Sequence, residues 1–264
     1  MLAGLMSAVR AGAPLVHCIT NYVTANDCAN LLLACGASPI MADDPDESAE
    51  ITRAASALVL NMGTPSPRRL EAMLRSGRAA SETGLPVVLD PVGVGCSSLR
   101  MEAARRLLAE ARISVIRGNA SEIAALAEGR RGERGVDSAA QGSVALARSL
   151  ARDTGAVVML TGAEDIVTDG ETTLAALGGH PMMRLITGAG CQLSALTGAF
   201  VAAAPARPLE AALAAACAMG LCGETAHARL HGPDGSAALR AYVIDAMSNL
   251  TPEALEEGAR YEVR

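Results

Sequence analysis

The segment Thr187–Cys191, with the sequence Thr-Gly-Ala-Gly-Cys, is the part of the chain whose residue types most clearly suggest chemistry. It leads into a long Ala-rich stretch that we expect to be helical, which would place the amides of Gly188, Ala189 and Gly190 at a helix N-terminus. Free amides there attract anions, and small side chains let the backbone approach a ligand closely. The sequence therefore predicts a site for a phosphoryl group at this turn; a Gly-rich helix start with a buried cysteine is the alternative.

Cys191 would lie in the first turn of that helix, where a thiol is expected to have a lowered pKa. It is therefore a candidate nucleophile, but the sequence shows no obvious His–Cys pair that would support this role. The other six cysteines form no Cys-x-x-Cys pair, and most stand in apolar runs. Such cysteines are typical of free, buried thiols in a reducing compartment.

Four short apolar runs, rich in β-branched residues, are typical of strands buried on both faces of a parallel sheet; they cover residues 57–61, 86–90, 113–116 and 156–160. Each run ends in polar or glycine residues, which are Asn61 to Thr64, Asp90 to Gly93, Arg117 to Asn119, and Thr161 with Gly162. Ligands bind at the carboxyl ends of the strands in such sheets. Four ends of this kind favour one shared ligand cleft over simple strand termination.

The segment Asn119-Ala120-Ser121-Glu122 allows two interpretations. Asn119 and Glu122 have the spacing of a capping box, in which both side chains bind amides at a helix start and play no part in catalysis. Alternatively, the Glu122 carboxylate holds a magnesium ion through water while the planar guanidinium of Arg117 binds a phosphate. The sequence alone leaves both interpretations open.

The remaining histidines and Met41 suggest structure more than chemistry. His17 stands in an apolar run and is expected to be a hydrogen-bonded core residue. The segment 36–41 is expected to close a helix and start a strand, and Met41 at its end would ordinarily fill the core. His180, His227 and His231 are scattered without the spacing of metal ligands, so we expect no zinc site.

Helical segments alternate with the predicted strands. We expect helices over residues 66–83, 99–111, 121–128 and 138–153, a surface loop over 128–138, a hairpin between 166–168 and 172–175, and Ala-rich helices after Gly190 that are broken at 205–208 and 232–235. The alternation predicts an α/β fold, with residues 1–264 forming a single three-layer α/β/α domain around a mostly parallel central sheet.

Composition excludes several classes of function. The 264 residues carry a net charge of −6 and include one Phe and no Trp, which argues against binding of nucleic acid. All 22 basic residues are Arg, so a phosphate-binding loop that ends in Gly-Lys-Ser/Thr is excluded. The N-terminal residues do not resemble a signal peptide, and the longest uncharged apolar run, residues 211–222, is too short for a bilayer. We therefore expect a cytoplasmic protein that has no membrane partner.

These motifs together resemble the hydroxyethylthiazole kinase family, which consists of thiamine-salvage enzymes with a ribokinase-like fold. The residues that carry the resemblance are 16–21 (Val-His-Cys-Ile-Thr-Asn), 36–41 (Gly-Ala-Ser-Pro-Ile-Met), 61–64, 89–93, 116–122, 161–162 and 187–191. Their order and spacing agree with the family over nearly the whole chain.

The resemblance implies that ATP donates its γ-phosphoryl group to the primary hydroxyl of 4-methyl-5-(2-hydroxyethyl)thiazole, with Mg²⁺. It also implies a homotrimer whose active sites lie at subunit interfaces. The site residues that it implies are Met41, Asn21 and Gly188 for the thiazole alcohol; Arg117, Thr161, Asn119 and Gly162 for ATP; Asp90 and Glu122 for magnesium, directly or through water; Gly188, Ala189 and Gly190 for the anion hole; and Cys191 beside the substrate hydroxyl.

Three other functions remain as alternatives at this stage. A related ribokinase-like kinase acting on hydroxymethylpyrimidine or pyridoxal would use the same cleft with different pocket residues. A nucleotide sensor without turnover would keep the cleft, although Asp90, Glu122 and Cys191 argue against it. A Rossmann dehydrogenase would need Gly-x-Gly-x-x-Gly, which neither Gly93-x-Gly95 nor Gly188-x-Gly190 completes.

Overall fold

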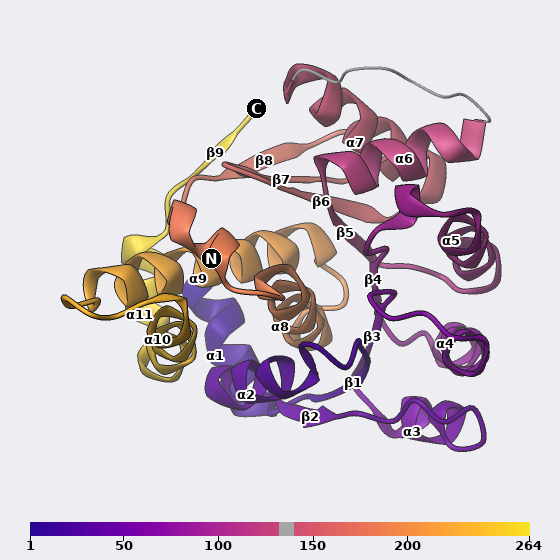
Figure 1. Ribbon diagram of the computed structural model, residues 1–264, viewed down its shortest axis with the longest axis horizontal. Coiled ribbons are helices and arrows are strands. Elements are labelled where there is room, and N and C mark those ends of the chain that lie inside the picture. Colours follow the sequence, from indigo (N-terminus) through magenta and orange to yellow (C-terminus); the bar gives the residue numbers. More distant parts are fainter. Residues whose placement is uncertain (132–139) are drawn as a thin grey trace.

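The structure is a computed structural model that describes residues 1–131 and 140–264. A central sheet has helices on both faces (Figure 1). The strands are β1 (Leu15–Ile19), β2 (Ser38–Ile40), β3 (Ala57–Asn61), β4 (Val87–Asp90), β5 (Val115–Asn119), β6 (Val157–Thr161), β7 (Asp165–Thr168), β8 (Thr173–Ala176) and β9 (Tyr261–Val263). The α-helices are α1 (Leu2–Gly12), α2 (Ala25–Cys35), α3 (Ser48–Ala54), α4 (Pro67–Thr83), α5 (Ser98–Glu110), α6 (Ala120–Arg131), α7 (Ala140–Thr154), α8 (Ala189–Ala203), α9 (Pro208–Ala228), α10 (Ser236–Asn249) and α11 (Pro252–Gly258), and the short 3₁₀ helices are η1 (Val94–Cys96) and η2 (Pro181–Leu185).

The strand order is β2-β1-β3-β4-β5-β6-β7-β8-β9. Every pair from β2 to β6 is parallel, and the last three pairs are antiparallel. The predicted α/β fold with a mostly parallel sheet is therefore confirmed. The carboxyl ends of β1, β3, β4, β5 and β6 meet along one edge of the sheet, because neighbouring strands run in the same direction.

Alternate residues of the buried strands pack into two separate cores. Val16 of β1 and Val59 of β3 belong to the core shared with α1, α2, α8 and α9, whereas Leu58 and Leu60 of β3 belong to the core shared with α4, α5, α6 and α7. Figure 1 shows these two groups of helices on opposite sides of the sheet. Strands buried on both faces need apolar residues at nearly every position, which explains the continuous apolar runs.

The element bounds follow local signals closely. The strand predicted at 57–61 is β3 without change, and α4 begins where Ser66 caps it by accepting a hydrogen bond from the Arg69 amide at 3.2 Å. The loop predicted over 128–138 is wrong for residues 128–131, which are the last turn of α6; residues 132–138 lie outside the described residues, as does the predicted start of the next helix at Ser138.

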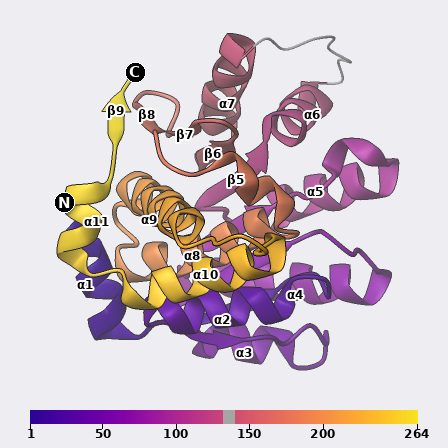
Figure 2. The ribbon, with the colours of Figure 1, turned by 60° about the vertical axis from the view of Figure 1, so that its left-hand side comes forward.

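β5 extends past its apolar residues, because Arg117, Gly118 and Asn119 continue the pairing with β6. Strands β1 and β9 were not predicted, whereas β2 lies in the segment 36–41, which was expected to close a helix and start a strand. Figure 2 shows β9 beside β8 at the edge of the sheet, and all three of its residues are exposed.

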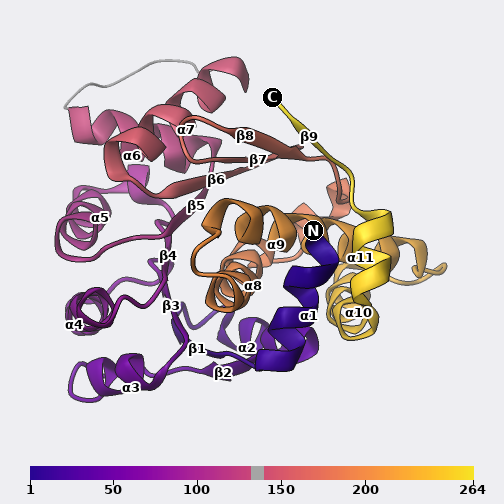
Figure 3. The same ribbon diagram turned by 180° about the vertical axis from the view of Figure 1, so that it is seen from behind.

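The Ala-rich C-terminal region forms α8, α9 and α10, with breaks where they were predicted. Helix α9 is long and apolar enough to cross a membrane by length and composition, because it extends beyond the run 211–222 on both sides; 72% of its apolar window is buried inside the protein. It packs against α8, α10 and the antiparallel strands, and Figure 3 shows it enclosed between the sheet and the outer helices. A core helix of this kind explains the apolar composition.

Candidate active site

The N-terminus of α8 lies at the carboxyl edge of the sheet, where side chains from the loop after β1 and from three strands meet it. Cys191, in the first turn of α8, is half-buried, and two amide groups donate hydrogen bonds to its Sγ: Asn21 Nδ2 at 3.3 Å and Asn61 Nδ2 at 3.2 Å. The two asparagines are themselves joined, since Asn21 Nδ2 lies 2.9 Å from Asn61 Oδ1. The thiol is therefore held in place by residues that follow β1 and end β3.

Asp90, at the end of β4, extends this network. Its Oδ2 accepts hydrogen bonds from Asn61 Nδ2 and from Ser194 Oγ, each at 2.7 Å. Its Oδ1 is buried with no hydrogen-bond partner in the described part of the chain. Buried carboxylate oxygens are rarely left in this state, so Oδ1 is the atom of the network best placed to meet a ligand.

The electrostatic setting of Asp90 and Cys191 opposes ionisation of both groups. Burial raises the pKa of Asp90, and the neighbouring Arg117 guanidinium and the Ser194 hydrogen bond partly offset this rise. Burial also raises the pKa of the Cys191 thiol, and the charge of Asp90 raises it further. The prediction of a lowered pKa for Cys191 is therefore wrong, because desolvation and a nearby carboxylate outweigh the favourable field of the helix end.

Arg117 connects the network to a cleft of about 630 Å³. Its Nη2 donates to Thr161 Oγ1 at 2.6 Å, and its Nη1 lies 3.7 Å from Asp90 Oδ2. A Cβ at Gly190 would overlap the guanidinium, so only glycine leaves room for this arrangement. Arg117, Thr161, Gly162 and Gly190 all line the cleft, as predicted for residues of one ligand site.

The start of α8 has the features of an anion site. Gly188 precedes the helix with φ +80°, a left-handed conformation that favours glycine, and a Cβ there would also overlap the Thr24 side chain. The amides in the first turn of a helix have no intrahelical acceptor. Ala189 and Gly190 line the cleft of Arg117, although the Ala189 amide donates to the Ile186 carbonyl at 3.3 Å. The structure thus brings the predicted phosphate turn, Arg117 and Cys191 together.

Glu122 forms the capping box that its spacing predicted. Asn119 Oδ1 accepts from the Glu122 amide at 3.0 Å, and Glu122 Oε2 accepts from the Asn119 amide at 2.9 Å. Glu122 Oε1 accepts in addition from the Gly93 amide at 2.8 Å, which ties the helix to the loop after β4. Asn119 is thus engaged at the cap and does not line the cleft of Arg117.

The carboxylates nevertheless fit a magnesium ion. Asp90 has a bare buried oxygen, and Glu122 lies near enough for its charge to raise the pKa of Asp90. Within residues 1–131 and 140–264, no three His, Cys, Asp or Glu side chains gather into a possible metal site. Magnesium is commonly held by one or two carboxylates, with water and phosphate oxygens completing its shell, and this donor set matches that pattern.

Met41 and Asn21 lie at the same edge of the sheet, but outside the cleft. Met41 follows β2 and is 38% exposed, and neighbouring Tyr22 and Val23 are 76% and 65% exposed. Apolar side chains exposed together in this way often mark a contact surface. His17, beneath this region, is fully buried and bonded to Thr52 Oγ1 and the Ala42 carbonyl, in agreement with its interpretation as a core residue.

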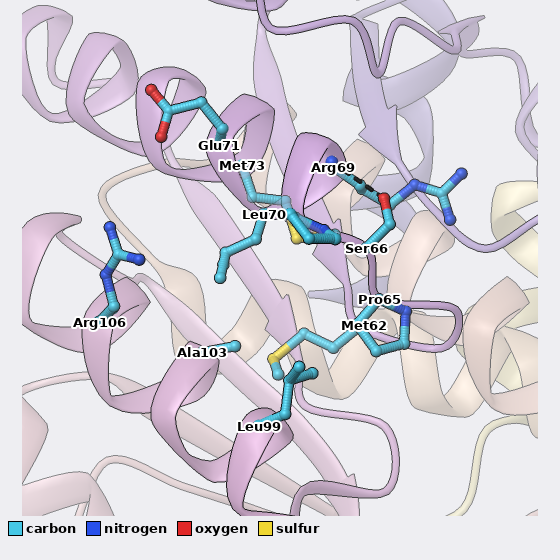
Figure 4. A pocket seen from close by; sticks show the side chains of 11 residues that line it. Met62, Pro65, Ser66, Arg69, Leu70, Glu71, Met73, Leu99, Ala103 and Arg106 are labelled. Carbon is cyan, nitrogen blue, oxygen red and sulfur yellow. Dashed lines mark hydrogen bonds between the residues drawn. The ribbon is translucent and has the colours of Figure 1, made fainter.

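A second cavity, of about 210 Å³, lies between α4 and α5 (Figure 4). Its lining is mostly apolar and includes Met62, Leu70, Met73 and Leu99. It contains none of the residues predicted for the site.

Sequence reasoning assigned no role to Asn61 or Ser194. The position of Asn61 at the end of a predicted strand was the sequence feature that could have identified it as a site residue. Ser194 follows Gly190 by one helical turn and donates to its carbonyl at 3.2 Å as well as to Asp90, and the helical spacing was the only signal that pointed to it.

Several known proteins resemble this chain in sequence and fold. A sequence model of the Hydroxyethylthiazole kinase family matches residues 6–253. The chain belongs to this family. Curated relatives named hydroxyethylthiazole kinase include one from Clostridium acetobutylicum, 47% identical with 99% of each chain covered, and one from Methanoculleus marisnigri, 48% identical with 99% of this chain and 93% of the relative covered.

Solved structures extend the comparison from sequence to fold. A hydroxyethylthiazole kinase protein from Pyrococcus horikoshii has a TM-score of 0.91 at 34% identity, covering 100% of this chain and 98% of its own. A pyridoxal kinase from Staphylococcus aureus in complex with ADP has a TM-score of 0.61 at 17% identity, covering 80% of this chain and 87% of its own, which is a likeness of fold. The predicted ribokinase-like fold and the resemblance to the hydroxyethylthiazole kinase family are both confirmed.

Proposed function

We propose that the chain, acting as one domain over residues 1–264, transfers the γ-phosphoryl group of ATP to the primary hydroxyl of 4-methyl-5-(2-hydroxyethyl)thiazole. The observation that carries this proposal is the meeting of three features at one place: the start of α8, the Arg117 cleft, and a thiol held by two asparagines. These supply an anion site, room for a nucleotide and a place for an alcohol. Membership of the hydroxyethylthiazole kinase family supports the choice of alcohol.

The nucleotide is assigned to the cleft of about 630 Å³. Its phosphates would face Arg117, Thr161 and Gly162. The rest of the lining includes the apolar Met183 and Met219, which suit a purine base. His180 also lines this part, and its ring stacks on that of His227 with the centroids 3.5 Å apart, so these two histidines are not scattered in space as their sequence positions suggested.

Asp90 and Glu122 would hold the magnesium ion, through Asp90 Oδ1 and through water at Glu122. Bound there, the ion supplies positive charge that neutralises phosphate oxygens during transfer. Since the chain has no lysine, Arg117 and the amides of Gly188 and Gly190 would provide the remaining stabilisation, because the Ala189 amide donates to the Ile186 carbonyl. Phosphoryl transfer depends mainly on such positioning and electrostatic stabilisation.

The alcohol is assigned to the space beside Cys191, with Asn21, Met41 and Gly188 as its contacts. Because Met41, Tyr22 and Val23 are exposed in the single chain, we infer that this side of the site is completed by a second copy, as expected for a homotrimer with sites at its interfaces. The cytoplasm is the compartment that fits this reaction and the seven free thiols.

A substrate panel tests the proposed reaction. ADP release is measured with ATP, magnesium and each of three alcohols: the thiazole alcohol, hydroxymethylpyrimidine and pyridoxal. We expect the thiazole alcohol to give the highest kcat/KM. Preference for another alcohol would assign the chain to a related kinase, and ADP release with none of them would favour a nucleotide sensor.

Cys191 is expected to contribute modestly as a proton acceptor, because the raised pKa of its thiol makes it mostly protonated at neutral pH. In a loose transition state the alcohol loses its proton late, so a strong base matters little. Cys191→Ala should lower kcat by roughly tenfold to a hundredfold, at or below the usual range for a general base. Cys191→Asp should remain active, since a carboxylate is ionised at neutral pH and is therefore more available as a proton acceptor than a protonated thiol.

Steady-state kinetics of both variants measure this contribution, and binding of an ATP analogue serves as the control for an intact cleft. Complete loss of turnover in Cys191→Ala, with folding and ATP binding preserved, would show that the thiol is essential.

A further inference from the structure

Arg69, near the start of α4, binds three loops at once. Its side chain is 3% exposed, and its Nε and Nη2 donate to Asp43 Oδ2 at 3.1 and 2.6 Å. Its Nη1 donates to the Thr64 carbonyl at 2.9 Å and also to Thr64 Oγ1. The guanidinium carbon lies 3.8 Å from the centre of the Tyr22 ring. Figure 4 shows the guanidinium directed away from the apolar side chains of Leu70, Ala103 and Leu99.

The three partners of Arg69 follow β1, β2 and β3, and two of them adjoin the residues assigned to the alcohol. Tyr22 comes directly after Asn21, and Asp43 comes two residues after Met41. From the other side, the His17 ring donates from Nε2 to the Ala42 carbonyl at 2.8 Å. The backbone of residues 41–43 is therefore fixed between a buried histidine and a buried arginine.

We propose that Arg69 is a positioning residue that sets the alcohol-binding side of the active site, through Asp43 for Met41 and through Tyr22 for Asn21. The inference rests on the proposed function, because the alcohol contacts come from it. A planar guanidinium suits this role, since it binds in fixed directions and can stack on an aromatic ring at the same time. Misplacement of a binding group by about 1 Å can cost up to roughly a hundredfold in rate.

The neighbouring Arg68 offers a matched control on the same loop. It pairs with Asp44 at 2.6 Å, but the two side chains are 65% and 46% exposed. Exposed ion pairs of this kind contribute little to stability, because water screens both charges. Loss of Arg68 therefore removes a charge from the same helix and a contact with the same loop, while leaving the buried connections of Arg69 in place.

The test is steady-state kinetics of Arg69→Met, Arg69→Lys and Arg68→Met, with the alcohol and ATP each varied. We expect Arg69→Met to raise the alcohol KM about tenfold, while kcat and the ATP KM change less than about threefold. Arg69→Lys should not restore the alcohol KM, because an ammonium group cannot bond Asp43 and Thr64 and stack on Tyr22 together. Arg68→Met should change each constant by less than about twofold.

Two outcomes would overturn the inference. An alcohol KM that stays unchanged in folded Arg69→Met would show that Arg69 does not act on the alcohol side. An equal change in kcat, alcohol KM and ATP KM, together with a lower melting temperature, would show a general structural role.

If Arg69→Met does not fold, Tyr22→Leu replaces it, because Tyr22 is 76% exposed and its loss spares the core. A raised alcohol KM is again expected, and an unchanged alcohol KM overturns the inference. Wild-type protein that releases no ADP with the thiazole alcohol would instead refute the proposed function.

Discussion

Replacing Asp90 with alanine is expected to lower kcat by about a thousandfold, which corresponds to about 4 kcal/mol of transition-state stabilisation. Three losses combine in this variant. The bare Oδ1 assigned to magnesium disappears, Arg117 loses the carboxylate 3.7 Å from its Nη1, and Asn61 and Ser194 lose their shared acceptor. Steady-state ADP release at saturating ATP and magnesium measures the effect, and circular dichroism checks the fold.

Two further variants identify which property of Asp90 matters. Asp90→Asn keeps the shape of the side chain and removes its charge, so it should lose nearly as much activity as alanine. Ser194→Ala keeps the carboxylate and removes one of the hydrogen bonds to Oδ2, so it should cost about tenfold or less. Normal turnover by Asp90→Ala would contradict the assignment of magnesium to this carboxylate.

Arg117→Lys is expected to lower kcat/KM for ATP by about a hundredfold, comparable to the loss of one donor from an oxyanion site. The guanidinium reaches Thr161 Oγ1, faces Asp90 and lies against Gly190 in the space that a Cβ would fill. A lysine ammonium is a single point charge and cannot occupy these positions together. ADP release with ATP varied at fixed alcohol measures the effect.

Thr161→Val is the companion variant, because it removes one partner of Arg117 and keeps the guanidinium. It should lower kcat/KM for ATP by about tenfold, less than Arg117→Lys. A kcat/KM for ATP within about twofold of wild type in Arg117→Lys would show that charge alone suffices and that the planar fork is not needed.

The central sheet could be predicted from sequence because its strands are buried on both faces. β3 was found with its bounds intact, since each of its residues is buried. β1 was missed because His17 interrupts its apolar run, although the histidine is satisfied by hydrogen bonds that only the folded chain supplies. β9 was missed because an exposed edge strand needs no apolar pattern at all.

The candidate site was predictable as a set of strand ends, but its internal connections were not. Asn61 contacts Asp90 and Cys191, which are 29 and 130 residues away along the chain. The sequence around Asn61 predicts neither contact. The predicted direction of the Cys191 pKa shift was wrong because it, too, depends on contacts between distant parts of the chain. The field of a helix end is a local property that a sequence reveals, whereas burial and the approach of Asp90 are produced by tertiary packing.

The amides of Asn21 and Asn61 have a consequence for the chemistry of an incoming hydroxyl. Each Nδ2 carries two hydrogens, and all four are already directed at Asn61 Oδ1, Asp90 Oδ2 and Cys191 Sγ. An alcohol bound beside the sulfur, as proposed, would therefore find no free amide hydrogen on these two side chains and could only donate a hydrogen bond to this part of the network. Neither asparagine would donate a hydrogen bond to the lone pairs of the alcohol oxygen. These lone pairs would therefore remain free to attack the phosphorus, which favours the reactive orientation of the alcohol.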